Sequence, residues 1–64
     1  MSPVEVVIAA HSQFYPTGGT DLENTRFFAN LAILLANELG DAGRVAELVG
    51  EAFQAEQHMK ASHG

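Results

Sequence analysis

The 64-residue sequence contains no cysteine and no tryptophan, and only three of its residues are lysine or arginine. Without cysteine the chain can form neither disulfides nor thiolate metal sites, and its composition fits a reducing compartment. The N-terminus also lacks the basic segment of a signal peptide, so we expect a cytoplasmic protein. Arg26, Arg44 and Lys60 are scattered along the chain. This argues against nucleic-acid binding, which depends on clustered basic side chains.

Long apolar runs are also missing. A membrane-spanning helix needs about 20 predominantly apolar residues. The most apolar stretch, residues 20–40, is interrupted by Arg26, Asn30, Asn37 and Glu38, so we expect no membrane span and no membrane partner. Eight acidic residues against three basic ones give a formal net charge of −5. That charge suits simple solubility or a basic protein partner.

The stretch from Thr20 to Gly40 predicts a central helix over residues 21–39. Thr20 is a good N-cap, and Glu23, three residues later, completes a capping box. Gly40 suits the position just after the helix, because glycine adopts the left-handed conformation without a Cβ penalty.

This central helix is apolar on most sides. At about 100° per residue, its polar strip is narrow and consists of Glu23, Arg26, Asn30 and Asn37. The large apolar residues cover much of the remaining circumference: Leu22, Phe27, Phe28, Leu31, Ile33, Leu34, Leu35 and Leu39. A helix of this kind must be covered on most sides.

A shorter helix is predicted over residues 3–15. Ser2 can cap it, Pro3 suits its first position, and Glu5 completes a second capping box. The competing interpretation is a strand, because residues 4–8 are rich in β-branched side chains. The cap and the helical spacing of the apolar residues agree with each other and favour the helix.

A third, amphipathic helix is predicted over residues 42–60, with Asp41 as its N-cap. The junction at Gly40 and Asp41 is short enough only for a sharp corner or a helical hairpin. The expected fold is therefore all-α: a single domain, 1–64, with a helical hairpin, a short N-terminal helix and a frayed tail over residues 61–64.

The apolar central helix also predicts self-association. Domains shorter than about 70–80 residues seldom build a generous core and often need disulfides, metal or a partner. Since cysteine is absent, a homodimeric helical bundle is the simplest way to cover the central helix. We expect the dimer interface to include Phe27, Phe28, Leu31, Leu34 and Leu35.

Catalytic, cofactor and metal sites are not expected. Glu51 and His58 share a helix face but lie seven residues apart, too far along the helix to converge on one metal ion. A phosphate at the Gly-Gly-Thr turn would be repelled by Asp21 and Glu23, and the Walker-type lysine is missing. We therefore expect no enzyme, no cofactor and no metal.

The remaining interpretation is a small acidic protein-binding module, acting as an inhibitor, antagonist or adaptor of a larger protein. Aromatic residues beside a glycine-rich turn are common anchors, so the expected partner-binding residues are His11, Phe14, Tyr15, Thr17 and Thr20. His11 has two interpretations: a partly buried histidine with one hydrogen-bonded ring nitrogen, or a pH-sensitive interface contact.

Two other functions stay open. One is a structural or accessory subunit of a multiprotein complex, and the other is a small-ligand carrier or tiny enzyme with a site at the dimer seam. In size and style the chain resembles the small accessory proteins with which phages disable host machinery, although no motif carries this resemblance.

Overall fold

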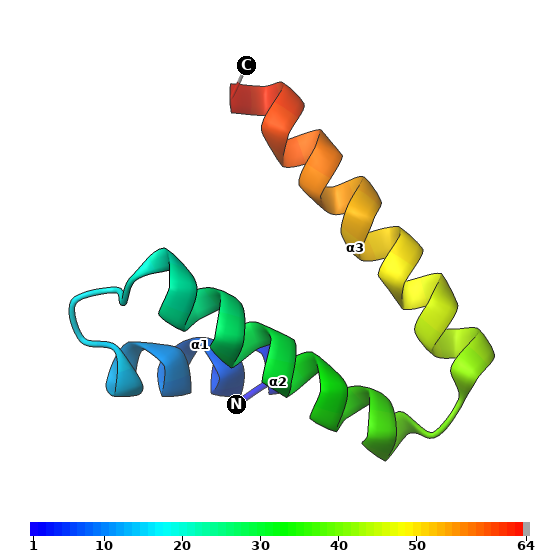
Figure 1. The fold of residues 1–64 in the computed structure, drawn as a ribbon, viewed down its shortest axis with the longest axis horizontal. Coiled ribbons are helices and arrows are strands. Elements are labelled where there is room, and N and C mark those ends of the chain that lie inside the picture. The colour runs from blue at the N-terminus through cyan, green and yellow to red at the C-terminus, as the bar shows by residue number, and fades with distance from the viewer. Residues whose placement is uncertain (64) are drawn as a thin grey trace. The chain divides into compact units, whose positions relative to one another are not determined.

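The computed structural model describes residues 1–63. They form three α-helices and no strand, in the order α1 (Pro3–Phe14), α2 (Asp21–Leu39) and α3 (Ala42–His63) (Figure 1). The prediction of an all-α chain with three helices is confirmed, and the alternative of a strand over residues 4–8 is wrong. Helix α3 continues three residues beyond its expected end at Lys60. The single domain and the fraying of residues 61–64 stay predictions.

Helix α1 begins with the capping box that the sequence predicts. The Ser2 hydroxyl accepts a hydrogen bond from the Glu5 amide at 3.2 Å, and the Glu5 carboxylate accepts one from the Ser2 amide at 3.3 Å. Pro3 occupies the first turn, where its missing N–H costs nothing. These local interactions favour helix over the strand preference of the β-branched residues that follow.

Helix α2 begins in the same way. Thr20 Oγ1 accepts from the Glu23 amide at 3.1 Å, and Glu23 Oε1 accepts from the Thr20 amide at 2.9 Å. The backbone amide of Thr20 and, to a smaller extent, its hydroxyl lower the pKa of the Glu23 carboxyl below its usual value of 4.5. The cap therefore stabilises the charged form of Glu23.

The turn between α1 and α2 requires glycine at two positions. The Gly18 amide donates to the Tyr15 carbonyl at 2.9 Å, and Gly18 and Gly19 have φ angles of +93° and +75°. A Cβ on Gly19 would lie 3.1 Å from Asn24 Oδ1 and 3.3 Å from the Tyr15 ring. Conformation and space thus both select glycine at position 19.

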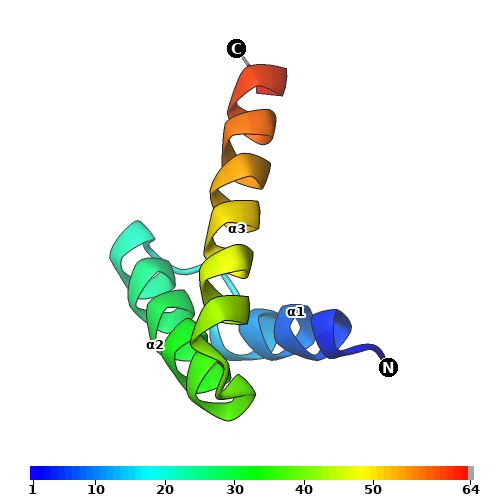
Figure 2. The ribbon, with the colours of Figure 1, turned by 90° about the vertical axis from the view of Figure 1, so that its right-hand side faces the viewer.

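Two residues make the junction between α2 and α3. Gly40, with φ +69°, ends α2, and its amide donates to the Ala36 carbonyl at 3.0 Å. Asp41 then caps α3 by accepting from the Arg44 amide at 3.0 Å. Both predicted roles are confirmed. Figures 1 and 2 show this corner between the end of α2 and the start of α3, and the closed helical hairpin stays a prediction.

The chain divides into two compact units, Met1–Asn30 and Leu31–Gly64. Unit 1 contains α1, the glycine turn and the first part of α2. Unit 2 contains the last part of α2, the Gly40–Asp41 corner and α3. Helix α2 therefore contributes residues to both units.

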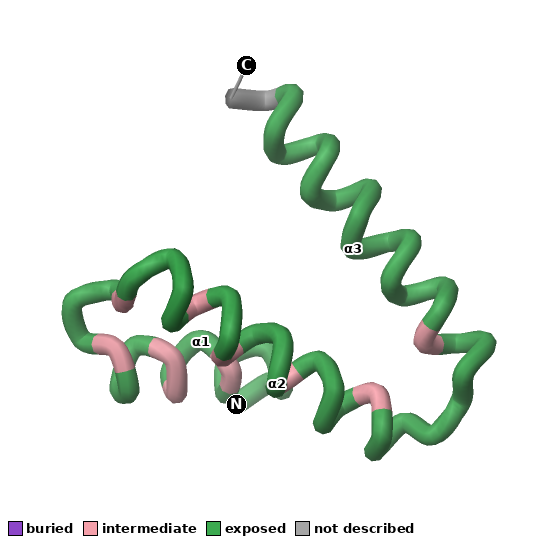
Figure 3. The backbone as a smooth tube through the Cα atoms, viewed as in Figure 1, coloured by how far each residue is buried: buried purple, intermediate pink, exposed green. Residues whose placement is uncertain are grey.

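Burial is slight along the part of the chain whose exposure the structure describes. Among residues 1–61, whose exposure the structure describes, none is buried, and the tube in Figure 3 shows only half-buried and exposed positions. Fifteen large hydrophobic side chains are exposed in this part of the chain, six of them on α2. Caps and turns thus define the helices, but no enclosed apolar core holds them together.

Replacing glycine by alanine should change the free energy of unfolding in opposite directions at positions 19 and 50. Gly19→Ala places a Cβ in a strained conformation and against Asn24, so we expect the free energy of unfolding to fall by about 1–3 kcal/mol. Gly50 lies in α3 with nothing within 4 Å of its added Cβ. Gly50→Ala should therefore raise that free energy by up to about 1 kcal/mol. Thermal unfolding followed by circular dichroism checks both, and equal effects of the two substitutions would contradict the assignment.

The Glu23 cap predicts a specific pH dependence. Because its pKa is lowered in the folded chain, the carboxylate contributes its full stabilisation above the usual value of 4.5. That contribution is lost as the pH falls through the lower, folded-state pKa. Wild type should therefore lose more thermal stability than Glu23→Gln between neutral pH and about pH 3. Identical losses in the two proteins would show that the cap carries no charge dependence.

Candidate binding surfaces

Unit 1 is held by a cluster of five rings around His11, here called the aromatic cluster. Its members are His11, Phe14, Tyr15, Phe27 and Phe28. The His11 ring is stacked on Phe28, with centroids 5.3 Å apart and an angle of 23° between planes. Its centroid also lies 5.3 Å from that of Tyr15 and 5.8 Å from that of Phe27. Helix α1 is thus joined to α2 mainly by ring contacts, each of modest strength.

A polar relay runs beside these rings. His11 Nε2 lies 2.6 Å from Asn24 Oδ1, and Asn24 Nδ2 donates to the Gly18 carbonyl at 3.0 Å. Since the Asn24 amide nitrogen is used as a donor, its oxygen must accept, and His11 Nε2 must carry the proton. The relay connects α1, the turn and α2. His11 is half-buried with one bonded ring nitrogen, and its role as an interface contact stays a prediction.

The structure brings three of the five expected partner-binding residues together. His11 and Tyr15 are half-buried in the aromatic cluster, whereas Phe14 is 64% exposed and contacts Phe27 edge-on at 6.4 Å. Thr17 is exposed in the turn, and Thr20 uses its hydroxyl for the α2 cap. Phe14 is therefore the member of this set with most apolar surface left for a partner, and the role of all five stays a prediction.

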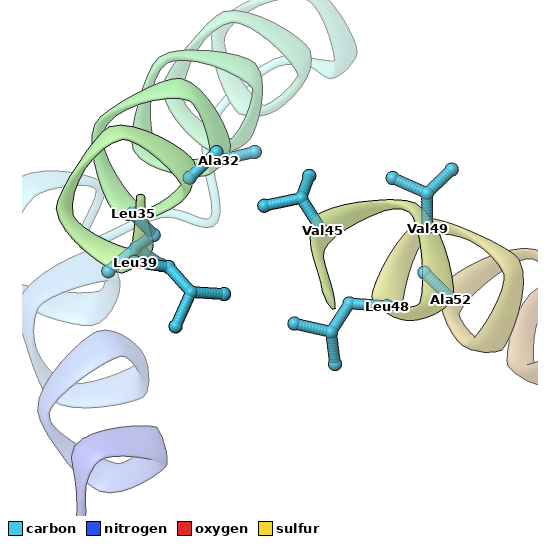
Figure 4. A pocket seen from close by; sticks show the side chains of 8 residues that line it. Ala32, Leu35, Leu39, Val45, Leu48, Val49 and Ala52 are labelled. Carbon is cyan, nitrogen blue, oxygen red and sulfur yellow. The ribbon is translucent and has the colours of Figure 1, made fainter. Parts of the chain in front are cut away.

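Unit 2 contains an open apolar groove between its two arms. The groove has a volume of about 260 Å³ and is lined only by aliphatic side chains: Ala32, Leu35, Ala36 and Leu39 on α2, and Val45, Leu48, Val49 and Ala52 on α3. Leu39, Val45 and Leu48 point into the space between the arms (Figure 4). We call these eight residues the apolar groove.

The residues expected at a dimer interface are divided between the two surfaces. Phe27 and Phe28 belong to the aromatic cluster, where they contact each other at 5.1 Å. Leu31 is half-buried, and Leu34 and Leu35 are exposed. Of the five residues expected at the interface, only Leu35 lines the apolar groove. Their place in an interface stays a prediction, because these contacts lie within one chain.

Sequence reasoning missed Asn24. Its spacing to Phe27, Phe28 and Leu31 is i, i+3, i+4 and i+7, which places it on the apolar face of α2. A lone amide on such a face needs a partner, since unsatisfied polar groups are costly there. The position of Asn24 on the apolar face was therefore the feature of the sequence that could have indicated its hydrogen bond to α1.

Neither a metal site nor a membrane span is visible in the described part of the chain. Residues 1–63 contain no group of three or more histidine or acidic side chains placed to hold a metal ion. No helix within the same residues combines the length and the apolar content needed to cross a membrane.

No protein-family model matches the sequence, and searches of curated proteins and of solved structures found no match.

The relay predicts that Asn24→Ala destabilises unit 1. The substitution removes both hydrogen bonds and leaves the partly buried His11 N–H without its acceptor, so we expect a loss of about 1–3 kcal/mol. Asn30→Ala, at an exposed position of the same helix, should change stability by less than about 0.5 kcal/mol. Chemical denaturation measures the stability of both variants.

Nitrogen NMR of His11 should also show the Nε2-protonated tautomer in the wild-type protein. The Nδ1-protonated tautomer would contradict the relay.

Proposed function

We propose that this chain is a small acidic protein-binding module that pairs with a second copy and occupies a surface of a larger protein. In this role it would act as an inhibitor, antagonist or adaptor. The observation that carries the proposal is the combination of fifteen exposed large hydrophobic side chains with no buried residue among residues 1–61. Such extensive apolar exposure is typical of interaction surfaces.

The size of the uncovered surface on α2 supports pairing. Six of its large side chains are between 44% and 66% exposed: Leu22, Phe28, Ile33, Leu34, Leu35 and Leu39. At about 1.5–3 kcal/mol for each complete burial, their exposed portions forgo on the order of 5–10 kcal/mol. This estimate is an upper bound, because unfolded chains already bury some apolar surface. It is still comparable with the whole stability of a small domain.

The aromatic cluster supports the proposed binding to a larger protein. It offers an exposed Phe14 beside rings that are already held in place by the His11–Asn24 relay. Rigid aromatic side chains bind with little loss of conformational freedom, which makes them effective anchors. The net charge of −5 would favour a partner with a basic surface.

Light scattering tests the pairing. At micromolar concentration we expect twice the mass of one 6.8 kDa chain, with circular dichroism showing the helices intact. The expectation follows from the apolar surface that only association removes from water. A well-folded monomer at this concentration would refute the pairing.

Affinity capture tests the anchor. The immobilised wild-type protein should retain a stoichiometric partner from a lysate of the cells in which it naturally occurs. Phe14→Ala should weaken that retention at least about tenfold, as loss of a buried aromatic anchor does. The matched control is Phe53→Ala, since Phe53 on α3 is 61% exposed and Phe14 64%. Equal retention by wild type and both variants would exclude Phe14 as an anchor. A partner that never dissociates would instead favour a permanent subunit of a complex.

A further inference from the structure

We draw no further inference here: the strongest candidate, the open apolar groove between the end of α2 and α3, is an unpartnered apolar face, and nothing in the structure shows what covers it.

Discussion

The structure depends on one constraint: the central helix needs more apolar cover than its neighbours in the chain provide. Only Phe27 and Leu31 among its eight large apolar residues are half-buried, and the other six are exposed. Hydrophobic burial is the main favourable contribution to folding, so a helix left this open lacks most of the stabilisation that its sequence could supply. The proposals of pairing and of partner binding both follow from that deficit.

Local interactions explain why the helices are nevertheless well defined. Capping boxes start α1 and α2, Asp41 caps α3, and positive φ angles at Gly18, Gly19 and Gly40 redirect the backbone. These interactions need only residues a few positions apart and do not require a core. The chain therefore combines precise helix ends with very little tertiary burial, an arrangement suited to completing its fold by association.

Interactions within one segment could be predicted from the sequence, whereas contacts between segments could not. Caps and helical spacing are encoded within single segments, so the three helices and the roles of Thr20, Glu23 and Gly40 were predictable. The extra turn of α3 beyond Lys60 was not, since nothing in the sequence marks its end. The partial burial of His11 was predictable from its apolar face, whereas its bond to Asn24 depends on how α1 meets α2. The grouping of Leu39 with Leu48 likewise depends on the corner that Gly40 and Asp41 form.

The short glycine turn has a consequence for the order in which structure is acquired. In unit 1 the ring contacts and the His11–Asn24 bond join segments separated only by that turn. Contacts between residues close in sequence form quickly, on the order of microseconds for small helical units. With pairing as proposed, the encounter of two chains becomes the slow step, and its rate rises with the square of their concentration. At low expression, newly made chains would thus remain longer with open apolar faces, where proteases and chaperones reach them first.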